Sequence, residues 1–194
     1  MVKKANPQSS GKSKPLRIAI IGSHGTGKTT LAKALVEKLK FNKIPDVVRM
    51  PGGAFDKGFQ IDKNTLPESQ FWILLKQLEF ERNIPPPWIS DKSLYDNIVY
   101  GQQTFKNKDF LKLIKEIVFR NAQYDLIVYL VPSFPYMHEN KRSTDPEFHK
   151  IIHRKYQEFL KENNIKHTII KEGDFEKRLN IALEIIKNAE KKSK

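Results

Sequence analysis

Residues 22–29 of the chain read Gly-Ser-His-Gly-Thr-Gly-Lys-Thr and match the spacing Gly-x4-Gly-Lys-[Ser/Thr]. The residues before them, Leu16 to Ile21, form an apolar run of strand type, and Leu31, Leu35 and Leu39 after them share one face of a helix. A glycine-rich turn between a strand and a helix is the context in which this spacing binds phosphate. The stretch therefore predicts a nucleotide-phosphate site rather than an ordinary turn.

The residue types in this loop suit an anion. Glycines at positions 22, 25 and 27 let consecutive N–H groups converge on phosphate oxygens at a helix N-terminus. Lys28 adds a mobile positive charge for the β- and γ-phosphates, and Thr29 offers a hydroxyl to Mg²⁺. We expect His24, at a variable loop position, to expose its imidazole to solvent. The loop residues expected to line the nucleotide site are Gly22, Ser23, His24, Gly25, Thr26, Gly27, Lys28, Thr29 and Thr30.

Length and composition restrict the class of protein. The chain has 194 residues, near the length of one α/β domain, and it has no cysteine, which excludes disulfides, thiolate metal sites and a cysteine nucleophile. No apolar run approaches the roughly 20 residues of a membrane helix, and residues 1–15 lack the apolar core of a secretory signal. We expect a cytoplasmic protein with no membrane partner and one domain over residues 16–190. A disordered basic arm (1–15) and a basic tail (191–194) flank that domain.

The net charge of +13 favours an anionic partner such as a nucleotide or a nucleic acid. Much of the excess lies at the two ends of the chain, where lysines are usually solvated and mobile. The charge therefore leaves nucleic acid as a possible partner without pointing to a specific site.

Strand and helix patterns alternate along the chain. Strands are expected at 16–21, in a segment near 46–50 that ends near Arg49, and at 88–91, 126–131 and 167–170. Helices are expected after the glycine-rich loop, after Thr65, at 94–103 and 108–121, after Asp145, and at 174–189. This alternation predicts an α/β protein with a parallel sheet between two layers of helices.

The helix after Thr65 is expected to have a polar face and an apolar face. Thr65 and Glu68 have the spacing of a capping box, so Thr65 is expected to cap the helix. Gln70, Gln77 and Glu81 share one face. The residues expected to point toward a core are Phe71, Trp72, Leu74, Leu75 and Leu78, although Phe71 and Trp72 are also candidates for stacking on a bound base.

Asp91 ends the short strand 88–91. Ligands of parallel α/β sheets gather at the carboxyl ends of the strands, which places this carboxylate beside the phosphate loop if the two strands are neighbours. There it would bind Mg²⁺ or accept the proton of an attacking hydroxyl, and the sequence does not separate these roles. The alternative is a helix cap for the segment that starts at Ser93.

A polar loop near residues 132–146 follows the fourth expected strand and carries Arg142. A cationic side chain that closes over a transferred phosphoryl group contributes on the order of 10³-fold or more to the rate. Arg142 is thus a candidate catalytic residue in a lid, with an exposed surface arginine as the alternative.

The chain resembles small P-loop ATP-binding domains grouped with the ribosylnicotinamide kinase domain and, more distantly, with nucleoside and nucleotide kinases. Beyond the phosphate loop, the resemblance rests on Pro-Asp-Val-Val-Arg at 45–49, the glutamine-rich helix 70–81, and Asp-Lys-Ser at 91–93 followed by Asp96 and Tyr100. It also rests on Arg-Ser-Thr-Asp at 142–145 and on Gly173 with Arg178. It covers nearly all of residues 16–188.

This resemblance implies a P-loop NTPase fold with a five-stranded sheet of order 2-3-1-4-5. It implies that Asp46 and Arg49 contact the phosphate acceptor together with Gln70 and Lys92, that Asp91 serves Mg²⁺ or the acceptor hydroxyl, and that Arg142 is the lid arginine. It adds Arg178 to the residues of the nucleotide site. The chain departs from the family pattern at Lys92, where arginine is usual, and at Asp46, where glutamate is usual; lysine lacks the two-pronged phosphate contact of arginine.

Three functions follow as hypotheses. The first is a Mg²⁺-dependent, ATP-dependent kinase acting on a nucleoside, a nucleotide or a ribosylated base. The second keeps this chemistry but uses a polynucleotide end or a modified base as the acceptor, with binding that weakens steeply with salt. The third is a nucleotide-dependent switch or ATPase that acts through a protein partner. The base-reading Asn-Lys-x-Asp pattern of GTPases is missing, since Asn140-Lys141 is followed two places on by Ser143.

Overall fold

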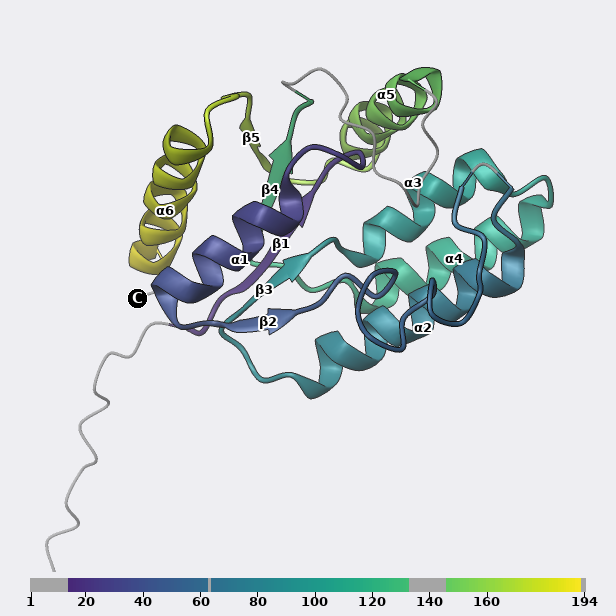
Figure 1. Cartoon of the computed structure of the whole chain (residues 1–194), viewed down its shortest axis with the longest axis horizontal. Helices are drawn as coiled ribbons and strands as arrows, with labels where there is room; N and C mark the ends of the chain where they lie inside the picture. The colour runs from purple at the N-terminus through teal and green to yellow at the C-terminus, as the bar shows by residue number, and fades with distance from the viewer. Residues whose placement is uncertain (1–13, 63, 133–145, 193–194) are drawn as a thin grey trace, which may run out of the picture.

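The structure is a computed structural model and describes residues 14–62, 64–132 and 146–192. Five parallel strands lie in the order β2-β3-β1-β4-β5 (Figure 1). They are β1 Arg17–Ile21, β2 Asn42–Ile44, β3 Trp88–Asp91, β4 Leu126–Leu130 and β5 Thr168–Ile170. The α/β class and the strand order implied by the resemblance are both confirmed.

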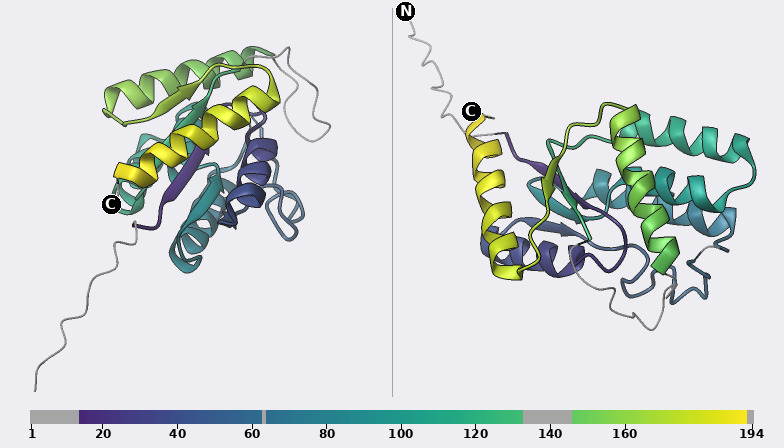
Figure 2. Two further views of the ribbon diagram at one scale, coloured as in Figure 1. Left: turned by 90° about the vertical axis from the view of Figure 1, so that its left-hand side faces the viewer. Right: turned by 90° about the horizontal axis from the view of Figure 1, so that it is seen from above.

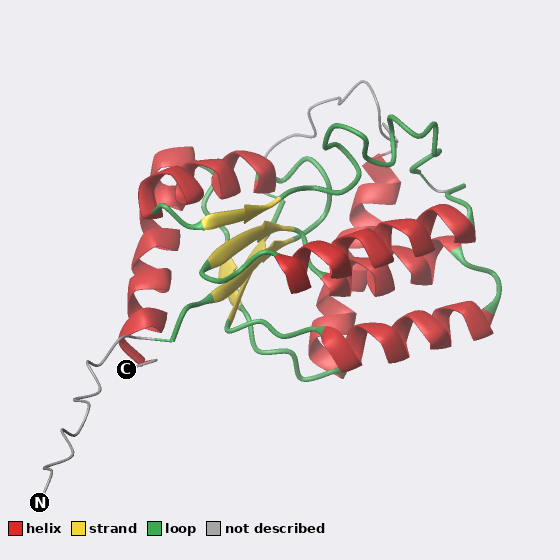
Figure 3. Cartoon of the chain, turned by 90° about the horizontal axis from the view of Figure 1, so that it is seen from below, coloured by secondary structure: helices red, strands yellow, loops and turns green. Residues whose placement is uncertain are grey.

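Helices cover both faces of the sheet and give three layers. One layer holds α1 (Lys28–Leu39) and α6 (Phe175–Lys192); the other holds α2 (Pro67–Asn83), α3 (Leu94–Thr104), α4 (Lys108–Asn121) and α5 (Pro146–Glu162). The right-hand view of Figure 2 shows α6 in yellow on one side of the strands and α5 in green on the other. Figure 3 shows the strands as one sheet with helices on both sides.

The sequence of β1 explains this layering. Side chains alternate across a strand, so Ile18 and Ile20 pack against α1 and α6, whereas Ala19 and Ile21 pack against the other layer. All four are fully buried. A strand covered on both faces needs apolar residues at every position, which is why this segment reads as a continuous apolar run.

The second strand lies earlier than expected. The prediction of a strand ending near Arg49 is wrong, because β2 covers Asn42–Ile44 and the chain turns directly after it. The Asp46 carboxylate accepts a hydrogen bond from the Val48 N–H (3.0 Å), and the Asp46 carbonyl accepts from the Arg49 N–H (3.0 Å). These bonds fold residues 46–50 into a turn, as aspartate side chains often do.

The start of α2 also differs from the prediction. Thr65 does not cap the helix, because its hydroxyl donates to the Asp62 carbonyl (2.6 Å) and accepts from the Asp62 N–H (2.9 Å). Leu66 is the N-cap residue and makes no side-chain cap bond. Leu75 was expected in the core, but 53% of its surface is exposed, while Leu74 and Leu78 are buried.

Phe71 and Trp72 of α2 are partly buried and pack against other side chains. The ring of Phe71 meets Phe110 edge-on at 5.6 Å, and Trp72 meets Phe59 edge-on at the same distance. Neither residue lines the two cavities described below. Packing therefore accounts for both residues, in preference to stacking on a base.

Within 14–62, 64–132 and 146–192, none of the helices is both long and apolar enough to span a membrane. The proposed arm lies almost entirely outside the described residues, and so does the lid between 133 and 145 with its Arg142.

Candidate active site

The phosphate loop joins the carboxyl end of β1 to the first turn of α1. Gly22 has φ 143°, and a Cβ placed on it would lie 2.5 Å from the carbonyl oxygen of Leu130 on β4. Gly27 has φ 83° and is the N-cap residue of α1. These two positions require glycine, because a side chain would clash in the first case and strain the backbone in both. The loop thus presents backbone N–H groups at a helix N-terminus, where anions bind.

Lys28 lies across this loop. Its ammonium donates a hydrogen bond to the Ser23 carbonyl (2.6 Å), and the Thr26 hydroxyl donates to the same oxygen (3.0 Å). Only 6% of the lysine surface is exposed. The charge is therefore held at the mouth of the loop, within reach of an anion bound there.

Arg178 of α6 supports the loop from the opposite side. Its guanidinium donates from Nη1 to the Thr26 carbonyl (2.5 Å) and from Nε and Nη2 to the Glu172 carbonyl (3.0 and 2.7 Å). Arg178 is buried. The structure brings this residue to the phosphate loop through the loop backbone, which links the last helix to the shape of the loop.

Asp91 stands beside the loop. It ends β3, which pairs with β1 so that Asp91 is opposite Ile20. Only 1% of its surface is exposed, and neither carboxylate oxygen has a hydrogen-bond partner among the residues that the structure describes. The reading of Asp91 as a helix cap is wrong, because α3 is capped by Ser93 in a capping box with Asp96.

The loop and Asp91 line one groove with the residues expected to contact the acceptor. Lys28, Thr29 and Asp91 line it. Asp46, Arg49 and Lys92 line it as well. A buried carboxylate with unused oxygens and a threonine hydroxyl are oxygen ligands of the kind that Mg²⁺ prefers, so these residues fit the cation.

Lys92 and Arg49 neutralise Asp46. The Lys92 ammonium lies 3.2 Å from one Asp46 oxygen, and Nε of Arg49 lies 3.9 Å from the other. Lys92 has φ 107°, an unusual conformation for a residue with a side chain. Its N–H donates to the Ile20 carbonyl (3.1 Å), which fixes the chain as it leaves β3.

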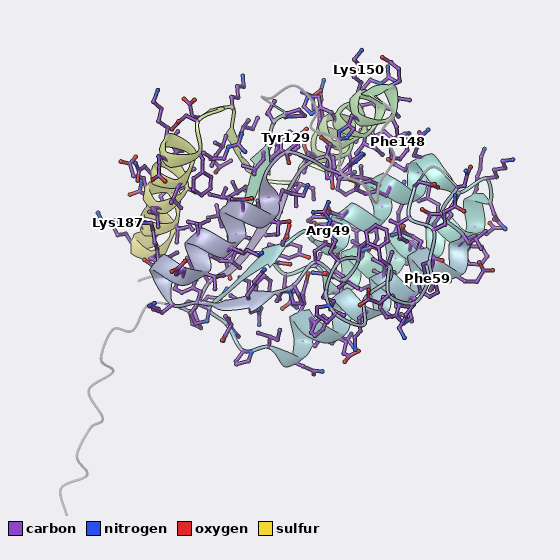
Figure 4. The ribbon with its side chains drawn as sticks, in the orientation of Figure 1. Arg49, Phe59, Tyr129, Phe148, Lys150 and Lys187 are labelled. Carbon is purple, nitrogen blue, oxygen red and sulfur yellow. The ribbon has the colours of Figure 1, made fainter. Side chains whose placement is uncertain are left out.

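A second cavity continues from the groove, because Asp46 and Lys92 line both. Gln70 and Asn97 lie on its polar side, where the Gln70 amide donates to the Asn97 side-chain oxygen (2.6 Å). Tyr100 and Phe148 are among its apolar residues. Figure 4 shows Phe148 on the side of α5 toward the body of the molecule and Lys150 on the outer side. We call this second cavity the acceptor pocket.

The comparison with protein families agrees with this geometry. The profile of a family described as an AAA domain matches residues 17–178. The chain belongs to this family. The match covers the phosphate loop, Asp91 and Arg178 together. A search of curated proteins finds no match.

Solved structures of nucleoside and nucleotide kinases have the same fold. Deoxyadenosine kinase from M. mycoides with bound products has a TM-score of 0.69 at 17% identity, over 88% of this chain and 98% of that one. The NadR protein in complex with NR has a TM-score of 0.70 at 20% identity over 89% of this chain, which spans only 50% of NadR. Thymidylate kinase from Candida albicans has a TM-score of 0.65 at 18% identity, over 91% and 92% of the two chains. This AAA domain therefore has the P-loop kinase fold.

His24 does not lie where the sequence placed it. The expectation of an exposed imidazole is wrong, because only 4% of its surface is exposed. Its ring centroid lies 3.5 Å from that of His149 and 5.8 Å from that of Phe148, both on α5. The tip of the loop is covered by a helix that begins more than a hundred residues later, and no local pattern shows that contact.

Sequence reasoning missed a partly buried polar network that reaches the acceptor pocket through Gln77. The Gln77 amide donates to Glu81 (2.8 Å) and to the Ser90 hydroxyl (3.0 Å), and the Tyr124 hydroxyl donates to Glu81 (2.8 Å). Removal from water raises the pKa of Glu81 to about 7, although the hydrogen bonds from Gln77 and Tyr124 act to lower it. The shared face of Gln70, Gln77 and Glu81 was the available signal, but the partner Tyr124 is far away in the chain.

Asp96 forms a second buried carboxylate at the acceptor pocket. It accepts hydrogen bonds from the N–H and hydroxyl of Ser93 (2.9 and 2.8 Å) and from the Tyr156 hydroxyl (2.6 Å). Burial raises the pKa of Asp96, and the positive charge of Lys92 opposes this rise. Asp96 thereby joins the start of α3 to α5 across the pocket.

Proposed function

We propose that the protein is a Mg²⁺-dependent kinase that transfers the γ-phosphate of ATP to a hydroxyl group of a nucleoside, a nucleotide or a ribosylated base. One observation carries this proposal. The buried carboxylate of Asp91, with no hydrogen bond to the described residues, lines the groove of the phosphate loop, and this groove shares Asp46 and Lys92 with the acceptor pocket. The two cavities therefore adjoin at Asp46 and Lys92, next to Asp91 in the chain.

Each side of the groove has a distinct part in the reaction. Backbone N–H groups of the loop bind and orient the phosphates, and the Lys28 ammonium moves from the Ser23 carbonyl to the phosphate oxygens. Bound Mg²⁺ would supply charge neutralisation of the phosphates, with Thr29 and Asp91 as the residues that hold it. The alternative role of Asp91 in this proposal is to take the proton of the acceptor hydroxyl, since its carboxylate lines the same groove.

The acceptor side would hold the hydroxyl that receives the phosphate. Asp46 is held by Lys92 at 3.2 Å and lines both cavities, so its carboxylate suits a hydroxyl that reaches from the acceptor pocket toward the loop. Gln70 lines the pocket but not the groove, and suits the remainder of the acceptor. Arg142, the proposed lid arginine, would add positive charge to the transferred group.

Transfer from labelled ATP to a panel of nucleosides, nucleotides and ribosylated bases tests this function. We expect product with Mg²⁺, and we expect Lys28→Ala and Asp91→Asn each to lower the rate at least about 10²-fold while the fold is retained. Lys33→Ala, on the exposed face of α1, and Asp109→Asn, on the surface of α4, are matched controls with normal activity. Hydrolysis of ATP without any phosphorylated product would contradict the proposal and favour an ATPase that acts through a partner.

A further inference from the structure

The acceptor pocket has more carboxylates than cations. Its described lining residues include three carboxylates, Asp46, Asp62 and Asp96, and one lysine, Lys92, although the whole chain carries a net charge of +13. Arg49 of the adjoining groove also lies 3.9 Å from Asp46, which leaves Asp62 and Asp96 in excess. Lys92 is paired with Asp46 at 3.2 Å and is therefore already neutralised. A phosphate group on the acceptor would bring further negative charge into this pocket, and like charges at short range are unfavourable. A neutral or cationic acceptor suits the pocket better.

The hydrogen bonds of Gln77 have a fixed direction. The Leu94 backbone N–H can only donate, and it donates to the Tyr124 hydroxyl (2.7 Å), so that hydroxyl must donate onward to Glu81 (2.8 Å). When Glu81 is ionised it can only accept, and Gln77 then turns its NH₂ group toward it (2.8 Å). The second N–H of Gln77 is used by the Ser90 hydroxyl (3.0 Å).

This leaves the side-chain oxygen of Gln77 for a ligand. No hydrogen bond among the described residues uses that oxygen, and Gln77 lines the acceptor pocket. Turning the amide over would place its oxygen against the Glu81 carboxylate, so this orientation holds above about pH 7, where Glu81 is ionised. Gln77 thus presents an acceptor, not a donor, to the pocket.

Gln70 likewise uses its NH₂ group within the protein and leaves its side-chain oxygen for a ligand. The Leu94 carbonyl can only accept, and it accepts from the Asn97 amide nitrogen (3.3 Å), so the Asn97 oxygen faces Gln70 and accepts from its NH₂ group (2.6 Å). The Gln70 side-chain oxygen has no partner within the described part of the chain. The N–H and C=O of one residue, Leu94, therefore orient both glutamines.

We infer that the phosphate acceptor is an unphosphorylated nucleoside-type compound whose ring edge offers N–H donors to Gln70 and Gln77, and that Glu81 is the positioning residue that fixes this preference. The inference rests on the proposed kinase function and names the substrate class within it. An exocyclic amine supplies two N–H donors, whereas a carbonyl at the same ring position supplies none and meets the glutamine oxygens with another acceptor.

Paired ligands test this selection in the full chain at pH 8, where Glu81 is ionised, with Mg²⁺ and a non-hydrolysable ATP analogue. In inosine and uridine a carbonyl replaces the exocyclic amine of adenosine and cytidine, and the neighbouring ring nitrogen gains a hydrogen, so one N–H donor remains where the amine compounds have two; adenosine and its monophosphate differ in charge. We expect calorimetry to show adenosine or cytidine binding at least about tenfold more tightly than its carbonyl partner, because a site built for a donor rejects the analogue that lacks it. We expect the monophosphate to bind at least about tenfold more weakly than adenosine.

Two variants test the role of Glu81 and Gln77. In Glu81→Gln the neutral amide can offer either a donor or an acceptor, so Gln77 is free to turn over, and the preference for the amine should fall to within about threefold. Gln77→Met removes the oxygen at similar length and should give the same loss. Both changes should raise KM for the amine nucleoside more than they lower kcat. Glu79→Gln is the matched control, because Glu79 is exposed on the same helix and pairs with Lys76 (2.8 Å).

Several outcomes would overturn the inference. Tighter binding of monophosphates would do so, and so would an amine preference that both Glu81→Gln and Gln77→Met leave unchanged. Failure of every nucleoside to bind would also overturn it. Transfer to a monophosphate that requires Lys28 would refute the inference and leave the kinase function standing, whereas absence of transfer to any acceptor would refute the kinase function itself.

Discussion

Lys92 combines an unusual backbone with a site contact. Its φ of 107° lies in the region that favours glycine, and its ammonium pairs with Asp46 at 3.2 Å. A strained residue of this kind costs on the order of 1–3 kcal/mol and persists where surrounding structure holds it. The residue follows Asp91 directly, so the unusual backbone turns the chain away from the sheet at the point where the carboxylate enters the groove.

Comparison of Lys92→Gly with Lys92→Ala separates the backbone from the charge. Both variants lose the ion pair with Asp46 and should lose acceptor turnover alike. Only glycine relieves the backbone, so Lys92→Gly should be more stable than Lys92→Ala by about 1 kcal/mol or more. Urea unfolding gives the difference, and equal stabilities would show that the backbone at Lys92 is not strained.

Glu81 gives a pH dependence of stability. Its pKa is raised from 4.5 to about 7 in the fold, chiefly by removal from water, and the charge of Asp96 adds to the rise while that of Arg17 opposes it. Folding therefore favours protonated Glu81. Its contribution to stability is fully present below about pH 4.5 and is lost as the pH rises through about 7.

Glu81→Gln should remove this dependence. Relative to the unaltered chain, the variant should gain about 1–2 kcal/mol between pH 5 and pH 8, a value reduced from the full effect of the pKa shift because the side chain is only partly buried. Urea unfolding at the two pH values measures the gain. A stability difference that stays constant with pH would contradict the raised pKa.

The phosphate loop and β4 form a rigid contact between elements. A Cβ on Gly22 would lie 2.5 Å from the Leu130 carbonyl, whereas a Cβ on Gly52, which also has a positive φ, would meet nothing within 4 Å. Gly22→Ala should therefore lower the free energy of unfolding by about 2–4 kcal/mol and weaken ATP binding, while Gly52→Ala should cost about 1 kcal/mol and leave binding unchanged. Equal effects of the two variants in thermal unfolding would show that the loop can move away from β4.

The sequence predicted the inner strands of the sheet better than the edge strand β2 and the start of α2. Apolar runs predicted β1, β3 and β4, because these inner strands are buried on both faces. The three-residue edge strand β2, Asn-Lys-Ile, carries no such run, and the apolar Val47 and Val48 that suggested a strand belong to a turn packed on α2. The prediction that Thr65 caps α2 was wrong because its hydroxyl is bound by the backbone of Asp62 instead.

At the scale of the whole molecule, local motifs predicted which segments form the site but not all of the contacts between those segments and the helices around them. The phosphate loop and Asp91 could be found because each is a strand end with distinctive residues, and the sheet order brings them together. The burial of His24 under α5 and the bond between Tyr124 and Glu81 join residues far apart in the chain. Such contacts depend on how the helical layer packs, which periodicity does not specify.

The groove is lined by the start of α1, which belongs to one helical layer, and by the segments after β2 and β3, which lead toward α2 and α3 of the other layer. Bound ATP would therefore contact both parts of the molecule at once. A ligand that binds only the folded state stabilises it by about 2.7 kcal/mol at a hundredfold excess over Kd.

Calorimetric titration of ATP into the full chain, with and without Mg²⁺, tests most directly whether residues 22–29 and Asp91 form one ATP–Mg²⁺ site. We predict saturable binding that Mg²⁺ strengthens, at least about tenfold weaker binding by Lys28→Ala, and loss of the Mg²⁺ effect in Asp91→Asn. Folded protein that takes up no ATP at millimolar concentration, or that binds it equally well after both substitutions, would contradict the assignment of this site.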